Sequence, residues 1–112
     1  MKRLIPTLFL IVASLCFMAL ATQAEDKPAG ADLFKQKCSM CHGADGKGFA
    51  ALKTPDFTDP KWQRSLKDKD IIETIKNGKK GTPMPPFADK LQEDEIQELV
   101  NYIRSLNSEK KK

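Results

Sequence analysis

Histidine and cysteine are scarce in this chain. His42 is the only histidine, and Cys16, Cys38 and Cys41 are the only cysteines. A structural zinc site takes four Cys or His ligands. Only Cys38, Cys41 and His42 lie outside the apolar N-terminal run, and the adjacent Cys41 and His42 are poorly placed to share one tetrahedral ion. The composition therefore disfavours a zinc-stabilised domain.

The chain also lacks strand patterns, since no segment alternates apolar and polar residues long enough to predict a sheet. Three segments predict helices instead: residues 31–41, residues 68–77 and residues 91–106. The last is the clearest, because five apolar residues recur at helical spacing: Ile96, Leu99, Val100, Ile103 and Leu106. The segments 49–66 and 79–90 carry prolines and predict loops. We therefore expect an all-α fold of three main helices joined by long loops.

Net charge is small, and part of it belongs to the N-terminus. Residues 1–24 have a basic start, an uncharged run and small residues at the end, which predicts a secretory signal peptide. We expect a domain at residues 25–112, with residues 108–112 as a disordered tail. Without the first 24 residues the net charge falls from +4 to +2, which does not support nucleic-acid binding, because that function needs a concentrated basic stripe. An exported, periplasmic monomer without a membrane span is expected; the alternative is an uncleaved anchor on the outer face of the cytoplasmic membrane.

The segment Cys38-Ser39-Met40-Cys41-His42 allows four interpretations. Zinc binding is disfavoured as above, and thiol redox chemistry would need a preceding strand. A disulfide would close almost no loop and stabilise little. Covalent attachment of haem c fits best, because C-x-x-C-H is the attachment pattern. On one helical turn both thiols lie on one face, and His42 turns the same way to ligate the iron.

A histidine ligand leaves the sixth position of the iron to another side chain. Met84 is the best candidate, since Met40 lies inside the attachment motif and cannot reach across. The prolines around Met84 make a stiff, extended strap that can hold a thioether. Lys79 and Lys80 are alternative ligands, and Met84 could instead simply pack within a proline turn.

The chain resembles the small single-haem class I cytochromes c of bacteria. The matching pieces are residues 30–48, residues 71–79, the methionine loop 81–87 and residues 91–106. This resemblance implies that the first and last helices cross beside the haem, where Gly30 and Phe34 meet Tyr102. It also implies that the Pro55 carbonyl accepts a hydrogen bond from His42. Gln92 departs from the family, which has Ser or Thr before the last helix. Trp62 is expected either to donate to a haem propionate or to be buried for its area alone.

These observations predict an exported one-electron carrier with one covalently bound haem c, not an enzyme. Cys38 and Cys41 would form the thioethers, and His42 and Met84 would ligate the iron. Its partners would be an electron donor and an electron acceptor protein. Surface lysines could steer an acidic partner or could simply be solvated. The alternative function is a gas-binding sensor or weak peroxidase with an open sixth iron position, although no second histidine is available as a distal base.

Overall fold

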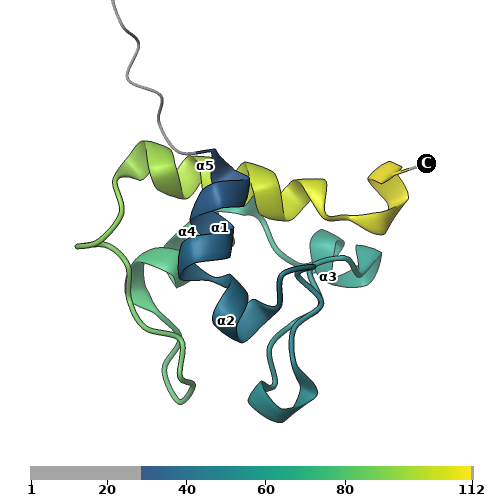
Figure 1. Ribbon diagram of the computed structural model, residues 1–112, viewed down its shortest axis with the longest axis horizontal. Coiled ribbons are helices and arrows are strands. Elements are labelled where there is room, and N and C mark those ends of the chain that lie inside the picture. The colour runs from purple at the N-terminus through teal and green to yellow at the C-terminus, as the bar shows by residue number, and fades with distance from the viewer. Residues whose placement is uncertain (1–28, 112) are drawn as a thin grey trace, which may run out of the picture.

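The computed structural model describes residues 29–111 and confirms the all-α prediction, because every regular element in this range is helical (Figure 1). In chain order the elements are α1 (Gly30–Lys37), α2 (Ser39–His42), the 3-10 helix η2 (Ala50–Leu52), α3 (Pro60–Ser65), α4 (Asp68–Asn77), α5 (Glu93–Ser105) and the 3-10 helix η3 (Ser108–Lys111). The predicted signal peptide lies outside the described residues. Within residues 29–111, none of the helices has the length and apolar content needed to cross a bilayer.

Helix α5 carries the core, and α1 lies across it (Figure 1). The predicted contact at this crossing is confirmed: the rings of Phe34 and Tyr102 are 5.2 Å apart, and Gly30 packs directly against Tyr102. Gly30 and Phe34 are both buried. Helix α1, which directly precedes the sequence motif, is thereby fixed to α5.

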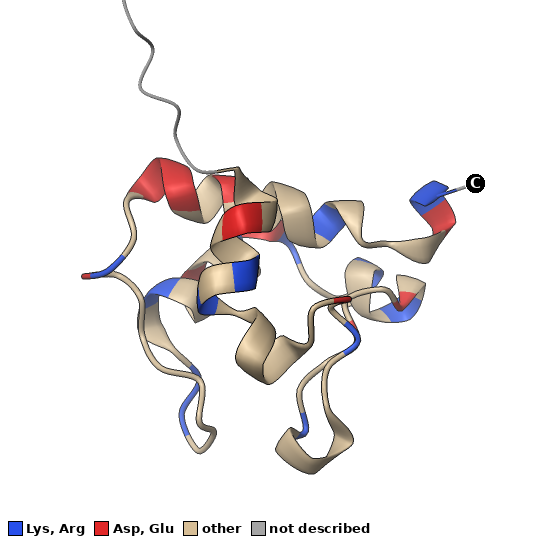
Figure 2. Ribbon diagram, in the orientation of Figure 1, with Lys and Arg blue, Asp and Glu red and all other residues tan. Residues whose placement is uncertain are grey.

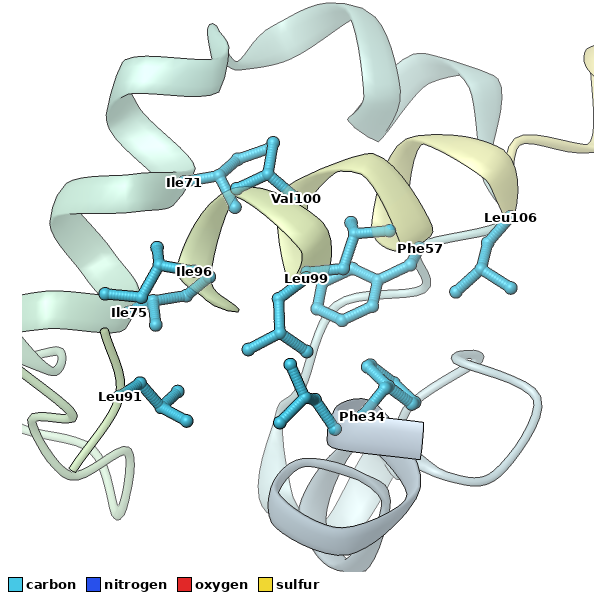
Figure 3. Close-up of a cluster of buried hydrophobic side chains, with 11 residues drawn as sticks. Phe34, Phe57, Ile71, Ile75, Leu91, Ile96, Leu99, Val100 and Leu106 are labelled. Atoms are coloured by element: carbon cyan, nitrogen blue, oxygen red, sulfur yellow. The ribbon is translucent and has the colours of Figure 1, made fainter. Parts of the chain in front are cut away.

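The core gathers apolar side chains from α1, α4, α5 and the loop before α3 (Figure 3). Its buried members are Leu33, Phe34, Phe57, Ile71, Ile75, Leu91, Ile96, Leu99, Val100, Ile103 and Leu106. Leu99 and Val100 are completely buried, as the period of the last helix predicts. Burial of these side chains is the main stabilising contribution in a chain of this size.

The predicted first helix is wrong in one detail. It is divided at Cys38, whose φ of −119° and ψ of −31° separate α1 from α2. The Ser39 hydroxyl donates to the Lys35 carbonyl at 2.6 Å across this break, so the two helices stay connected. Leu33 and Phe34 form the buried face of α1, and Ala31 lies on its exposed side.

The segment predicted as a loop at residues 49–66 contains two short helices, η2 and α3. Helix α3 starts at Pro60, and the Asp59 carboxylate caps it by accepting from the Lys61 backbone N–H at 2.9 Å. Both residues favour a helix start, but six residues are too few for an apolar period. Further along, α5 begins at Glu93, and the Glu95 carboxylate accepts from the Gln92 backbone N–H at 2.8 Å, so Gln92 forms a workable helix start.

Two further expectations concern segment ends. Helix α4 ends at Asn77 as predicted, and Gly78 follows with a φ of 69°. The tail, expected to be disordered, instead forms η3 at Ser108–Lys111, where Glu109 pairs with Arg64 at 2.9 Å. The backbone N–H of Ser108 also donates to the Thr58 carbonyl at 3.1 Å, which fixes the start of this turn on the domain.

Candidate functional site

Helix α2 places the residues of the sequence motif on one turn. The backbone N–H groups of Cys41 and His42 both donate to the Cys38 carbonyl, at 3.2 and 3.0 Å. Cys38 is half-buried against the core, whereas Cys41 is exposed. The two thiols and the imidazole therefore come from five consecutive residues, with one thiol directed toward the interior and the other accessible from outside.

Both cysteines are free thiols. Burial raises the pKa of the Cys38 thiol from 9.0 to about 11, and the nearby Cys41 adds to the increase. Redox-active and nucleophilic cysteines need the opposite change, a lowered pKa that supplies thiolate at neutral pH. The electrostatics of this turn therefore do not support thiol redox chemistry, in agreement with the sequence analysis.

His42 is enclosed by aromatic rings. Its imidazole stacks on the Phe57 ring with centroids 4.7 Å apart and an interplanar angle of 22°, and the Phe34 ring lies 6.5 Å away. Burial lowers the pKa of His42 below its ordinary value of 6.5, so the imidazole is neutral at pH 7. Neutral imidazole is the form that binds metal ions. Its Nδ1 atom is buried and has no hydrogen-bond partner within residues 29–111.

Pro55 and His42 both contact Gly48, but the Pro55 carbonyl is not bonded to the buried Nδ1 of His42 in the structure. Its carbonyl oxygen would be 2.7 Å from a β-carbon built on Gly48, and the Gly48 backbone N–H donates to the His42 carbonyl at 2.8 Å. Gly48 has a φ of 73° and no room for a side chain, so only glycine fits between the two segments. The loop after the motif thus packs Pro55 against the same glycine that is bonded to the His42 backbone, while the expected hydrogen bond to Nδ1 stays a prediction.

The Met84 loop is held by backbone hydrogen bonds to the end of α4. The Lys79 N–H donates to the Met84 carbonyl at 3.3 Å, and the Phe87 N–H donates to the Ile75 carbonyl at 2.9 Å. The Met84 N–H donates to the Thr82 hydroxyl at 3.3 Å, and the Met84 side chain is half-buried. In Figure 1 this loop and the loop after α2 project on the same side of α5. Met84 therefore lies on a loop that hydrogen bonds hold in one conformation.

Trp62 lies on α3, packed against the core, with its ring 4.6 Å from that of Phe57. It is half-buried, which agrees with either role expected for it. Gln63 beside it was missed by the sequence analysis, which placed it in a loop; it is a buried amide that bonds to two backbone carbonyls. Nothing in the sequence pattern indicated that contact, because one of the carbonyls lies 40 residues away.

The donor set suits a haem better than a bare metal ion. Within residues 29–111 there is no group of three or more His, Cys, Asp or Glu side chains that could hold a metal. What the turn offers is two thiols for covalent attachment and one neutral imidazole, with a thioether on a separate strap. Within residues 29–111 the buried Nδ1 of His42 has no hydrogen-bond partner, so this atom is available for the bond that is expected to the Pro55 carbonyl.

The helical fold and this single turn define a small class I cytochrome c. Within that class, the chain belongs to the family described as cytochrome c oxidase, cbb3-type, subunit III, which it matches over residues 25–103. Cytochromes of this kind carry a covalently bound haem c, and they transfer electrons. Haem c is therefore the cofactor of this chain.

Its relatives include cbb3-type cytochrome c oxidase subunits. The FixP subunit of Bradyrhizobium sp. (strain ORS 278) is 35% identical over 88 residues, which cover 79% of this chain and 30% of the relative. The CcoP subunit of Rubrivivax gelatinosus is 33% identical over 90 residues, covering 80% of this chain and 29% of the relative. The chain thus spans less than a third of the length of these curated relatives.

A solved structure of similar size is also related. The KustC0563 c-type cytochrome is 35% identical with a TM-score of 0.66, and the match covers 71% of this chain and 99% of that one. Cytochrome cL of Methylophaga aminisulfidivorans is 31% identical with a TM-score of 0.59, covering 70% of this chain and 51% of that one. The fold of this chain therefore also makes up nearly the whole of a small c-type cytochrome.

Proposed function

We propose that this chain is an exported electron carrier whose haem is attached through Cys38 and Cys41 and ligated by His42 and Met84. The observation that carries the proposal is the single turn of α2, which holds both thiols and a neutral, ring-stacked imidazole. When bound, the haem supplies reversible one-electron chemistry at its iron. The side chains described above attach, orient and shield it.

The cysteines act as anchors. A thiol on each end of one helical turn fixes the turn relative to the cofactor, and the exposure of Cys41 keeps that edge near the surface. Because Cys38 is half-buried and stays protonated, it is not diverted into disulfide exchange. The covalent attachment also supplies the additional stabilisation that a small core needs.

The fixed conformation of the loop that carries Met84 supports Met84 as the second iron ligand. The hydrogen bonds from Lys79 and Phe87 fix the loop, so little conformational entropy is lost when the thioether is held in one place. The competing ligands Lys79 and Lys80 have exposed, hydrated ammonium groups. A thioether ligand raises the redox potential, because it favours the ferrous state.

We propose acidic redox proteins as partners. Figure 2 shows acidic residues at the start of α5 and lysines on the two loops that project from the other side. The exposed lysines on these loops are Lys47, Lys53, Lys79 and Lys80. Such an asymmetry orients a carrier as it approaches a partner. The relatives named as cbb3 oxidase subunits make a terminal oxidase of that type the first partner to test.

Export is part of the proposal. We propose that residues 1–24 are removed and that residues 25–112 form the mature carrier outside the cytoplasm; retention would leave it anchored to the outer face of the membrane instead. The intact mass of the purified protein distinguishes the two outcomes, since a cleaved chain lacks the leader and a retained one keeps it.

A redox titration tests the proposed function. The haem-loaded chain is titrated while its visible spectrum is recorded, and carbon monoxide is then added to the reduced form. We expect one reversible one-electron transition and no binding of carbon monoxide, because both axial positions are filled. Rapid binding of carbon monoxide to the parent chain would contradict an electron carrier and favour a gas-binding or peroxidatic haem protein.

A further inference from the structure

The Phe57 ring lies flat against the His42 imidazole. Their centroids are 4.7 Å apart with an interplanar angle of 22°, and Phe57 is only 6% exposed. On its other sides Phe57 meets Trp62 at 4.6 Å and Phe34 at 6.2 Å. The ring is therefore wedged among aromatic neighbours and cannot turn away from the imidazole without disturbing them.

Within residues 29–111 the structure shows no hydrogen bond to Nδ1 of His42, and the bond expected to the Pro55 carbonyl stays a prediction, so ring contacts are the orienting contacts that the structure shows. A histidine that binds a metal is usually oriented by a hydrogen bond from its second ring nitrogen. The Nδ1 atom of His42, however, is buried without a partner within residues 29–111. The stacked Phe57 ring is thus the closest ring contact of the imidazole, and it also covers one of its faces.

The backbone of Phe57 is clamped by Gln63. The Gln63 amide nitrogen donates to the Phe57 carbonyl at 2.6 Å and to the Ile103 carbonyl of α5 at 2.8 Å. Because carbonyls only accept, the amide nitrogen must face them, and the amide oxygen accepts from Arg104 at 3.2 Å. Gln63 is 6% exposed, and the Phe57 N–H donates to the Gly46 carbonyl at 2.8 Å. Phe57 is thereby fixed from both sides of its backbone.

We propose that Phe57 and Gln63 are positioning residues for His42: the Gln63 amide joins the Phe57 backbone to α5, and the Phe57 ring sets the plane of the imidazole and shields it. This inference rests on the proposed role of His42 as an iron ligand. It adds a ring stack, supported by a buried amide, to the hydrogen bond that is expected between His42 and the Pro55 carbonyl.

Removal of the ring should change both orientation and redox potential. Without it the imidazole can rotate, and water can reach the face of the imidazole that the ring covers. Water solvates the extra charge of the ferric state better than an apolar ring does. The ferric state is therefore stabilised, and the potential should fall.

The test uses the full, haem-loaded chain. Phe57→Leu removes the aromatic ring while keeping an apolar side chain, and Phe57→Tyr keeps the ring. Gln63→Met keeps the length of the side chain but cannot donate to the two carbonyls. Val100→Ala is the matched control, since Val100 is completely buried on α5 and is not among the ring contacts of His42. The measurements are the midpoint potential, the denaturant midpoint and the haem methyl resonances of the ferric protein, which report the orientation of the axial imidazole.

We expect Phe57→Leu to lower the potential and to shift the haem methyl resonances. Gln63→Met should change both readouts in the same direction but by less. Phe57→Tyr should keep both readouts at parental values. Val100→Ala should lower the denaturant midpoint and leave the other two readouts at parental values. A folded Phe57→Leu variant with parental potential and resonances would overturn the inference, as would an equal shift in Val100→Ala. If Phe57→Leu does not fold, Gln63→Met decides by the same criteria. A parent whose iron carries no histidine would overturn the proposed function itself, which separates the two failures.

Discussion

Gly30 and Glu98 meet where α1 crosses α5, and their backbones are almost in contact. A β-carbon built on Gly30 would lie 2.2 Å from the Glu98 carbonyl oxygen and 2.8 Å from its carbonyl carbon. Both atoms belong to the backbone and cannot move aside as a flexible side chain could. The crossing of the two helices therefore depends on the missing side chain at position 30.

Gly30→Ala should accordingly weaken the fold. Separation of the two helices would loosen the packing of Phe34 on Tyr102, and overpacking of this kind costs about 1–3 kcal/mol. The measurement is urea unfolding of the haem-loaded protein, followed by helix circular dichroism. Ala31→Ser, on the exposed side of the same helix, is the control and should change stability by less than about 0.5 kcal/mol. Equal stability of Gly30→Ala and the parent would show that the crossing is not as tight as described.

Met84→Ala should lower the redox potential and open the iron to carbon monoxide. Loss of a thioether ligand removes its preference for the ferrous state, and a shift of at least ~59 mV corresponds to a tenfold change in the redox equilibrium. The measurement is a spectroscopic redox titration followed by addition of carbon monoxide to the reduced protein. Lys79→Ala and Lys80→Ala serve as controls and should keep the parental potential. A lysine variant that reproduced the Met84→Ala phenotype, with Met84→Ala unchanged, would transfer the ligand role to that lysine.

Stability of the haem-free chain, in which no iron holds the imidazole, should fall as the solution is acidified. Burial lowers the pKa of His42 in the folded chain, so the unfolded chain takes up a proton first as the pH drops. The stabilisation is complete above the unfolded pKa of 6.5 and is lost below it, with a slope that approaches about 1.4 kcal/mol per pH unit between the two pKa values. Urea midpoints of the haem-free chain at pH 7.5, 6.5 and 5.5 provide the measurement. A midpoint that rose toward pH 5.5 would mean that His42 is more easily protonated in the folded chain than in the unfolded one.

The sequence was most informative where its pattern was repeated or local. The five apolar residues of the predicted last helix indicated its buried face correctly: all five are buried, four in α5 and Leu106 directly after it. The motif Cys38 to His42 is contained in one turn, so its local geometry could be inferred without knowledge of the fold. The contact of Gly30 and Phe34 with Tyr102 was predicted from the family resemblance and is confirmed.

The sequence was least informative for contacts between distant segments. Gln63 bonds to a carbonyl 40 residues away, and no local pattern encodes such a pair. Helix α3 was missed because six residues show no period, although Asp59 and Pro60 are favourable at a helix start. The break at Cys38 was missed as well, since no glycine or proline marks it. The ligand role of Met84 and the hydrogen bond of Pro55 remain predictions.

The central claim is the attachment of one haem through Cys38 and Cys41. Its most direct test is the intact mass of the chain, purified under denaturing conditions from a host with haem-ligation machinery, together with single Cys38→Ala and Cys41→Ala variants. We expect the parent chain to be heavier than its amino-acid mass by one haem and to keep a haem spectrum after denaturation, while each variant retains less haem. A folded, colourless parent chain at its amino-acid mass would contradict the account.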